Sequence, residues 1–454
     1  MMNGSAASMT STIAEVRLHR VAVPLVRPFV TAVRTATEID AMIVEVIDSD
    51  GRSGWGEAPT SWRVTGESPQ SVTAAVEGPL REAALGLPVN DPAGASLALE
   101  RAVVRNSSAR MAVDCALYDL AAQYAGVPLF RMLARSSSTP ARPEPASGSS
   151  PRDTSPRAVS PATLRADSAA ASATAVRTDM TLSAVADATG IQQLVETAVQ
   201  HRDAGFRTLK LKVGAGGDDV VAMQAVRDAV GPSVTLRADA NQGWSPTRAV
   251  GVIRAWEDAG LDVQLIEQPV HRDDIDGLAF VTARVTTPVL ADESVWTSRD
   301  AREVIARHAA DMINIKLAKT GGIREAIALR DLAASAGVRV IVGCMMESHV
   351  GIAAAAAVAA SIDASAPVAA VGVAPGADPS GASPGTDPFD TSSGTAAASA
   401  ASPSASPKLA AAPMAHDLDA GLWMRRSPVH GGIRYEGETV HLAEAPGLGI
   451  TALR

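Results

Sequence analysis

The most constraining feature of this chain is a repeat that begins near residue 178: a short β-rich run, a polar residue at its end, then an amphipathic stretch typical of a helix. Lys212, Asp239, Glu267, Asp292 and Lys316 end five successive runs and are 27, 28, 25 and 24 residues apart. One strand-loop-helix unit of a parallel barrel takes about 25 to 30 residues, since eight units occupy roughly 250. The sequence therefore predicts a β/α barrel. Its eight strands are expected at 178–183, 208–213, 234–239, 263–267, 288–293, 312–316, 338–343 and 416–419.

An open, doubly wound α/β sheet is the alternative architecture for such a repeat. That fold normally carries a phosphate-binding turn with the spacing G-x-G-x-x-G after its first strand. The segment KVGAGGDD at 212–219 has glycines after the second run but lacks this spacing. We therefore interpret it as a loop and retain the barrel.

Charged residues gather at the predicted strand ends, where parallel barrels carry their chemistry. In TLKLKVG (208–214), Lys210 and Lys212 alternate with apolar residues, so both side chains point to one face of the strand. A lone Lys-x-Lys is usually a solvated surface, and a lone aspartate after a strand is usually a helix N-cap. Five successive strands ending in Lys, Asp, Glu, Asp and Lys are not explained by capping, and they indicate one shared site.

Asp239, Glu267 and Asp292 are expected to converge because they end three neighbouring strands. Close carboxylates repel one another unless a cation lies between them, and oxygen ligands without His or Cys favour Mg²⁺. Lys212 and Lys316 end the strands on either side. This arrangement suits removal of a proton α to a metal-bound carboxylate, with Lys212 as a base and Lys210 as a charge that tunes it. The metal would stabilise the resulting enediolate.

Composition excludes several classes of partner. The chain has 454 residues, 46% of them hydrophobic, which is enough for one large domain and a smaller one. The formal net charge is −9 and there is no long basic run, so neither nucleic acid nor a membrane surface is an expected partner. The apolar run at 350–362 is too short to span a membrane and is expected to be a buried helix.

Cysteine content and low-complexity segments set two further expectations. Cys115 and Cys344 are too few for a disulfide framework, and MMNGSAASMTSTIAEV lacks the order of a secretion signal, so we expect a cytoplasmic protein. Segments 135–176 and 363–413 are rich in Ser, Pro, Ala and Gly with almost no large apolar residues. Such segments are typical of mobile loops.

Several motifs together resemble the enolase superfamily, within it the muconate-lactonizing subgroup, and most closely the dipeptide epimerases of the L-Ala-D/L-Glu type. The resemblance implies a capping domain at 1–134, a catalytic barrel at 177–420 and a tail at 421–454 that returns to the capping domain. The fold it implies is an enolase-type β/α barrel with an α+β cap. The motifs are PFVTAVRTA, GWGEAP, TLKLKVG, RADANQGW, IEQPV, ADESV, INIKLAKTGGI, GCMMES and HDLDAGLW.

The resemblance also implies roles for individual residues. Asp239, Glu267 and Asp292 match the Mg²⁺ ligands, and Lys212 and Lys316 match two acid/base catalysts on opposite faces of the substrate α-carbon. In similar enzymes, a pair such as Asp417 and Asp419 accepts the ammonium group of a dipeptide, and an arginine such as Arg34 binds a glutamate side chain. Further positions that resemble substrate-contacting ones are Thr181, Lys210, Cys344 and Met346, and Phe29 resembles an apolar contact of the cap.

These features predict a Mg²⁺-dependent epimerase acting on a small dipeptide, an isomerase, with a place in cell-wall peptide recycling. A cycloisomerase or an o-succinylbenzoate synthase of the same superfamily is an alternative, but their substrates lack the ammonium group that Asp417 and Asp419 would bind. A non-catalytic, metal-stabilised scaffold is a third alternative, and it would not need the paired lysines. The sequence leaves the preferred dipeptide and homo-oligomerisation open.

Overall fold

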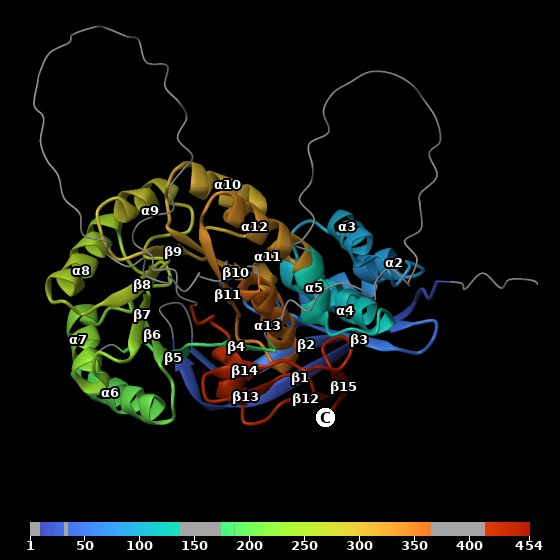
Figure 1. Ribbon diagram of the computed structural model, residues 1–454, viewed down its shortest axis with the longest axis horizontal. Coiled ribbons are helices and arrows are strands. Elements are labelled where there is room, and N and C mark those ends of the chain that lie inside the picture. Colours follow the sequence, from blue (N-terminus) through green and yellow to red (C-terminus); the bar gives the residue numbers. More distant parts are fainter. Residues whose placement is uncertain (1–9, 31–34, 137–173, 186, 365–413) are drawn as a thin grey trace, which may run out of the picture.

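The computed structural model describes residues 10–30, 35–136, 174–185, 187–364 and 414–454. Most of the two predicted low-complexity loops, and Arg34, lie outside these described residues. Two bodies are visible within one compact arrangement: a barrel layer built from residues after 174, and an antiparallel sheet with helices built from the N-terminal part (Figure 1).

The predicted barrel is confirmed. A parallel sheet places its strands in chain order, so that each strand lies beside the next, and helices cover its outer face (Figure 1). Its strands are β5 (Met180–Leu182), β6 (Thr208–Lys212), β7 (Thr235–Asp239), β8 (Val263–Glu267), β9 (Val289–Ala291), β10 (Met312–Lys316) and β11 (Arg339–Gly343). The helices are α6 (Ala188–Asp203), α7 (Asp219–Val230), α8 (Pro246–Asp258), α9 (Ile275–Thr282), α10 (Ser298–Ala306), α11 (Leu317–Thr320), α12 (Ile323–Ser335) and α13 (His349–Asp363).

The register of the sheet aligns the charged strand ends. Lys212 is paired with Asp239, and Asp239 is paired with Glu267. Lys316 ends β10, and Asp292 directly follows β9. The strand ends therefore form one rim, which is the location predicted from the sequence spacing.

The predicted eighth strand at 416–419 is wrong as a strand, although its first residues close the barrel. His416 forms a bridge to Thr178, next to β5, and Asp417 forms a bridge to Gly343 at the end of β11. Asp419 instead begins a 3-10 helix, η3 (Asp419–Trp423).

Side chains explain why the ladder stops after Asp417. In a continuing parallel ladder, the N–H of Thr181 would donate to the carbonyl of Leu418, but it donates to Asp419 Oδ2 at 2.8 Å. The carbonyl of Leu418 accepts from the hydroxyl of Tyr435 at 2.6 Å, and its N–H donates to Thr178 Oγ1 at 2.8 Å. Two hydroxyl groups and a carboxylate thus replace the strand partners.

The N-terminal body is an antiparallel sheet covered by a buried helix. Gly54 and Gly56 permit close contact between β3 and α4, because an added Cβ would lie 2.1 Å from the carbonyl oxygen of Ala116 and 1.9 Å from that of Ala112. Its strands are β1 (Ile13–Val30), β2 (Thr35–Asp48) and β3 (Ser53–Pro59); its helices are α1 (Pro69–Ala75), η1 (Val76–Leu80), α2 (Arg81–Ala84), α3 (Pro92–Ala102), α4 (Ser107–Tyr124) and α5 (Leu129–Ser136).

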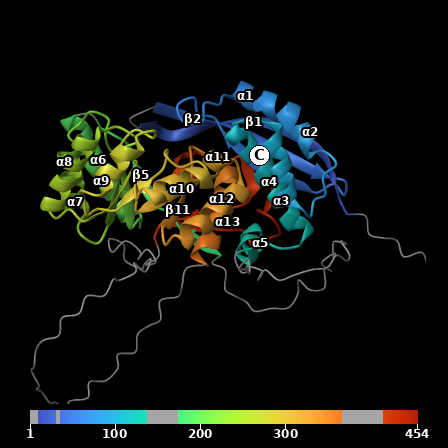
Figure 2. The same ribbon diagram turned by 90° about the horizontal axis from the view of Figure 1, so that it is seen from above.

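The C-terminal tail contacts both bodies, and in Figure 2 its strands lie close to where they meet. Leu25 of β1 bridges Met424, and Pro128 bridges Gly447. The tail strands are β12 (Val429–Gly431) with β15 (Ile450–Leu453), and β13 (Arg434–Glu436) with β14 (Thr439–His441), which also pairs with β4 (Ala175–Arg177).

The helix α13 confirms the expectation of a buried helix at 350–362. Its residues Val350–Ser361 are buried, and it packs against α5, β3 and β11. Within the described ranges, no helix is both long and apolar enough to cross a membrane.

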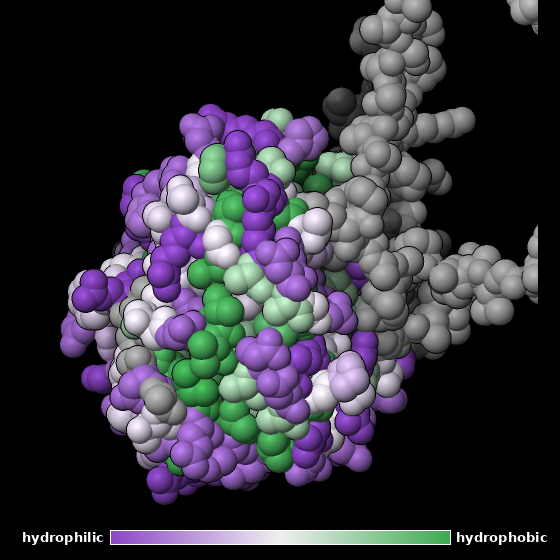
Figure 3. Space-filling view, turned by 90° about the vertical axis from the view of Figure 1, so that its left-hand side faces the viewer, coloured by the Kyte–Doolittle hydropathy of each residue, from purple (hydrophilic) through white to green (hydrophobic). Residues whose placement is uncertain are grey.

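The outer face of the barrel carries an apolar band that crosses a mainly hydrophilic surface (Figure 3). This view looks at the side where α6, α7, α8 and α9 lie in Figure 1. Val221 of α7 and Phe280 of α9 are among the exposed large hydrophobic residues. Both residues lie on helices of the outer layer.

Glu57 of β3 joins the capping body to the barrel. Its buried carboxylate accepts hydrogen bonds from the N–H of Ser348 at 2.8 Å, the hydroxyl of Ser348 at 2.5 Å and the N–H of Gly351 at 2.9 Å. These groups form the N-terminus of α13, where unpaired N–H groups favour an anion. Glu57 is thus an N-terminal cap supplied by a segment 291 residues distant in sequence.

Glu57→Ala is expected to lower the free energy of unfolding by about 2–4 kcal/mol, because it removes charge-assisted hydrogen bonds and leaves buried donors unpaired. Chemical denaturation would measure the change. Glu77→Ala, on an exposed residue of the same body, is the matched control and should change stability by less than about 0.5 kcal/mol. Equal stabilities of the two variants would contradict the capping role.

Candidate active site

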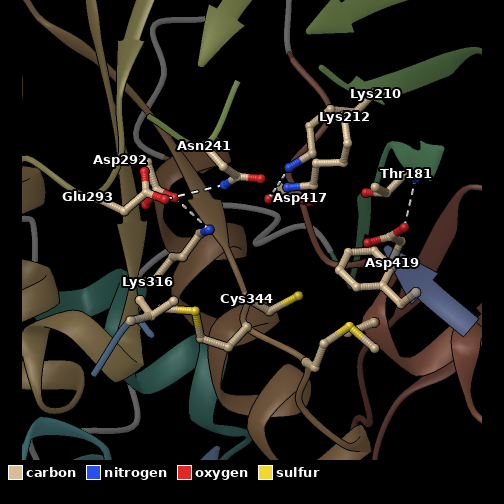
Figure 4. Close-up of a pocket in the computed structure, with 15 residues that line it drawn as sticks. Thr181, Lys210, Lys212, Asn241, Asp292, Glu293, Lys316, Cys344, Asp417 and Asp419 are labelled. Atoms are coloured by element: carbon tan, nitrogen blue, oxygen red, sulfur yellow. Dashed lines mark hydrogen bonds and ion pairs between the residues drawn. The ribbon is translucent and has the colours of Figure 1, made fainter. Parts of the chain in front are cut away.

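A pocket opens where the strand ends of the barrel face the capping body. Phe29 of β1 and Val64 line it from the capping side, and charged residues line it from the barrel side. The barrel residues are Thr181, Lys210, Lys212, Asn241, Asp292, Glu293, Lys316, Cys344, Met345, Met346, Asp417, Asp419 and Ala420. Figure 4 shows their side chains converging on the pocket.

Lys210 and Lys212 point to the same side of β6, as the strand alternation predicted. Lys212 Nζ lies 2.6 Å from Asp239 Oδ2, and Lys210 Nζ lies 3.7 Å from the same oxygen. Lys210 Nζ also lies 2.5 Å from Asp417 Oδ2 and 3.3 Å from Glu267 Oε2. Lys210 therefore links the carboxylates of β7 and β8 to the carboxylate of the closing segment.

Lys316 lies on the other side of the pocket, beside Asp292 and Glu293 (Figure 4). Its Nζ donates to Asp292 Oδ2 at 2.8 Å and lies 3.9 Å from Glu267 Oε1. Burial of this ammonium group opposes ionisation, but the charges of Asp292 and Glu267 raise the pKa of Lys316 well above its ordinary value. In this arrangement Lys316 holds its proton.

Burial governs the charge of the neighbouring carboxyl groups. Desolvation and the nearby charge of Asp239 raise the pKa of Glu267 to about 7, and desolvation and the charge of Asp292 raise the pKa of Glu293 to about 7. Asp417 is also desolvated, yet the ammonium groups of Lys210 and Lys316 hold its pKa at about 2. The pocket thus carries a firmly ionised carboxylate beside Lys210.

The structure brings Asp239, Glu267 and Asp292 together on neighbouring strand ends, each 1% exposed or less. Their oxygens face lysine ammonium groups rather than one another. Among the described residues, the three carboxylates with oxygens within 4.8 Å of one another form another group, Asp179, Asp417 and Asp419.

The donor set nevertheless fits a divalent cation. The three strand ends themselves contribute only carboxylates, and a set of oxygen ligands without His or Cys suits Mg²⁺. The largely buried groups around the pocket include seven carboxyl groups against five cationic side chains, so acidic groups outnumber basic ones. These carboxyl groups are Asp179, Asp239, Glu267, Asp292, Glu293, Asp417 and Asp419, and the cationic side chains are Lys210, Lys212, Arg237, Lys316 and Lys319.

The remaining predicted site residues fall into two sets. Thr181, Cys344 and Met346 line the pocket, as do Asp417 and Asp419, so the structure brings these predicted substrate contacts together. Arg34 lies outside the described residues. Phe29 also lines the pocket, and its ring packs against Trp423.

Several buried residues of the site were missed in the sequence. Lys319 Nζ lies 2.6 Å from Asp292 Oδ1 and donates to the carbonyl of Asn314 at 2.9 Å. Its position three residues after Lys316 was a usable signal, because Lys319 lies in the turn of helix that directly follows the strand ended by Lys316. Asp179 pairs with Arg237 at 2.9 Å beneath the pocket, and nothing in their local sequence distinguishes this pair from surface charges.

Asn241 and Glu293 accompany Asp239 and Asp292 at the strand ends, as their sequence positions indicated, but their contact with each other was not predicted. Asn241 Nδ2 donates to Glu293 Oε1 at 3.3 Å, while Asn241 Oδ1 and Glu293 Oε2 are buried without a hydrogen-bond partner in the described part of the chain. Both residues line the pocket, so these unsatisfied oxygens add to its capacity for a cation or a polar ligand.

Two family models match this chain. One is described as Mandelate racemase / muconate lactonizing enzyme, N-terminal domain, and matches residues 13–134. The other is described as Enolase C-terminal domain-like and matches residues 193–374. The fold and the strand-end residues thus define an enolase-type barrel with its capping domain. The chain belongs to the mandelate racemase and muconate lactonizing enzyme family of the enolase superfamily, as the resemblance predicted.

Several similar proteins are epimerases. The L-Ala-D/L-Glu epimerase of Bacillus subtilis (strain 168) is 34% identical over 440 residues, 96% of each chain. A solved substrate-liganded complex of the B. subtilis L-Ala-D/L-Glu epimerase has a TM-score of 0.75 and 34% identity, covering 98% of this chain and 99% of that one. A dipeptide epimerase from Enterococcus faecalis V583, solved with Mg and L-Leu-L-Tyr, has a TM-score of 0.74 and 29% identity, covering 97% and 100%. Epimerases are isomerases, and the expectation of an isomerase is confirmed.

Proposed function

We propose that this protein is a Mg²⁺-dependent dipeptide epimerase that inverts the α-carbon of the C-terminal residue of L-Ala-D/L-Glu or a related dipeptide. One observation carries the proposal: a single pocket is lined by lysines from opposite sides, Lys212 and Lys316, and by the carboxylates of Asp417 and Asp419 (Figure 4). Relatives named for epimerisation of L-Ala-D/L-Glu support the substrate class.

The two lysines supply proton transfer on both faces of the α-carbon. Lys212 ends β6 and Lys316 ends β10, with three strands between them in the curved sheet. One ammonium group donates a proton on one face while the other lysine, as a neutral amine, removes a proton from the opposite face. Mg²⁺, held by Asp239, Glu267 and Asp292, would stabilise the negative charge that develops on the substrate carboxylate.

Asp417 and Asp419 would bind the free ammonium group of the dipeptide. Both carboxylates line the pocket and are 4% exposed, so a cation between them would be well shielded from water. Substrates of cycloisomerases and o-succinylbenzoate synthases have no ammonium group to place there. A scaffold protein, in turn, would have no use for two nearly buried lysines facing one pocket.

The physiological setting is part of the same proposal. An L-Ala-D/L-Glu epimerase would act on peptides released from the cell wall, in the cytoplasm. Cys115 and Cys344 are both free and buried, which is compatible with a reducing compartment.

The test is a dipeptide library incubated with the enzyme and Mg²⁺ in D₂O, followed by mass spectrometry and chiral analysis. We expect deuterium at the C-terminal α-carbon of L-Ala-L-Glu together with formation of the D-Glu epimer. Arg34→Met should lower kcat/KM for L-Ala-L-Glu by about ten- to a hundredfold and leave L-Ala-L-Leu nearly unchanged, because a guanidinium pairs with the glutamate carboxylate. No exchange with any dipeptide would overturn the proposed function. A uniform effect of Arg34→Met would instead exclude Arg34 as the glutamate contact.

A further inference from the structure

The carboxylate of Asp419 is oriented through one of its two oxygens. Oδ2 accepts hydrogen bonds from the N–H of Thr181 at 2.8 Å and from Trp423 Nε1 at 3.1 Å. Oδ1 accepts none from the residues that the structure describes, and Asp419 lines the pocket. Oδ1 is therefore the oxygen available to a cation in the pocket.

Trp423 is itself fixed by the capping strand. The Arg27 guanidinium carbon lies 4.8 Å from the centroid of the Trp423 ring, and the Phe29 ring meets it edge-on at 4.9 Å. Arg27 Nη2 donates in turn to His201 Nε2 of α6 at 2.7 Å. The indole is 2% exposed, so two residues of β1 and one helix of the barrel determine its position.

Further hydrogen bonds join strand β1 to the segment that follows η3. Leu25 bridges Met424, the residue after η3, and the N–H of Arg425 donates to the carbonyl of Pro24 at 3.1 Å. Arg425 Nε also donates to the carbonyl of Leu25 at 3.1 Å. Strand β1 and helix η3 therefore form one packed unit beside the pocket.

A buried indole N–H needs an acceptor, so a purely structural role for the Trp423 hydrogen bond is the simplest alternative. Its acceptor, however, is a pocket carboxylate, and the bond occupies the oxygen that Thr181 also binds. Together these two donors fix the carboxylate plane and leave Oδ1 toward the pocket.

We propose that Trp423 is a positioning residue through which β1 of the capping body orients Asp419 toward the ammonium group of the substrate. This inference rests on the proposed function. If Trp423 positions Asp419 in this way, the affinity for the amino end of the dipeptide also depends on Arg27. Arg27 would act through the indole ring and not by contact with the substrate.

A double-mutant cycle tests this coupling, with KM and kcat measured for L-Ala-L-Glu. Trp423→Phe keeps a ring against Arg27 and Phe29 but removes the N–H donor, and it should raise KM about tenfold with kcat changed less than threefold. In an Asp419→Asn background the same change should add less than about twofold. A structural role would give independent, multiplicative effects, and that result, or an unchanged KM for Trp423→Phe, would overturn the proposal.

Arg27 provides a second route that leaves both Trp423 and Asp419 in place. Arg27→Met should raise KM about three- to tenfold, and Arg27→Lys, which keeps a cation over the ring, should restore most of the affinity. If Trp423→Phe fails to fold, the two Arg27 variants test the proposal alone. Equal KM values for Arg27→Met, Arg27→Lys and the wild type would overturn it. Absence of epimerisation in the wild type would overturn the proposed function itself, which is a distinct outcome.

Discussion

Lys212→Ala and Lys316→Ala are each expected to lower the rate of epimerisation by about 10²–10⁴-fold, the range typical of general acid-base catalysts. Each variant should still exchange the α-proton of one stereoisomer with D₂O, because the remaining lysine faces one side of the α-carbon. NMR would follow exchange of L-Ala-L-Glu and L-Ala-D-Glu separately. Opposite stereoisomers should be exchanged by the two variants.

Lys212→Arg and Lys316→Arg are the matched controls for charge. A guanidinium can keep the ion pairs to Asp239 and Asp292, but it does not release its proton in proteins. Both arginine variants should therefore be as inactive in epimerisation as the alanine variants. Substantial activity with arginine at either position would show that the lysine acts by its charge alone.

Removal of the metal ion is expected to stop turnover completely, and added Mg²⁺ should restore it. Asp239→Asn, Glu267→Gln and Asp292→Asn should each weaken Mg²⁺ binding by tenfold or more, because each replaces a carboxylate ligand with a neutral amide. Isothermal titration calorimetry with Mg²⁺ alone would measure this without reference to activity.

The structure offers an internal control, because a second group of carboxylates, Asp179, Asp417 and Asp419, lies near the strand-end group and has oxygens within 4.8 Å of one another. Asp417→Asn should leave Mg²⁺ affinity within about threefold of the wild type while raising KM for dipeptides. If Asp417→Asn abolishes Mg²⁺ binding and Asp292→Asn does not, the cation belongs to the group of Asp179, Asp417 and Asp419, and the assignment from the strand ends is wrong.

The barrel could be predicted because its signal is local and periodic. Each strand from β5 to β11 is a short β-rich run at regular spacing, and alternation along β6 was sufficient to place Lys210 and Lys212 on one face. The rim of charged residues followed from the same spacing, since parallel strands end on one side of a barrel.

The closing segment could not be predicted from its own sequence. Whether His416 to Asp419 forms a strand depends on the hydroxyls of Thr178 and Tyr435 and on the carboxylate of Asp419, which replace the backbone partners. The pairing of Asp179 with Arg237 is similarly nonlocal, because the two residues are 58 positions apart and are buried together only in the folded sheet. Contacts of this kind depend on tertiary packing. They produce no periodic pattern in a single sequence.

The contacts between the capping body and the barrel could not be predicted from the sequence either. GWGEAP was recognised as a motif, but the sequence did not indicate that its Glu57 caps a helix that starts near residue 349. Trp423 is part of the motif HDLDAGLW, but the sequence did not indicate a role for it. Its contacts are with Arg27 and Phe29, near the other end of the chain.

Closure of the barrel by His416 and Asp417 has a consequence for biosynthesis. Gly343, the last residue of β11, leaves the ribosome 74 residues before Asp417, an interval of about 4–15 s at common elongation rates. During this interval β5 and β11 lack their shared neighbour and present unpaired N–H and carbonyl groups, which invite pairing with other chains. The nascent protein would therefore pass through a stage that holds every proposed metal ligand and both lysines but has open sheet edges, and its yield in cells should depend on chaperones that shield such edges until the last segment arrives.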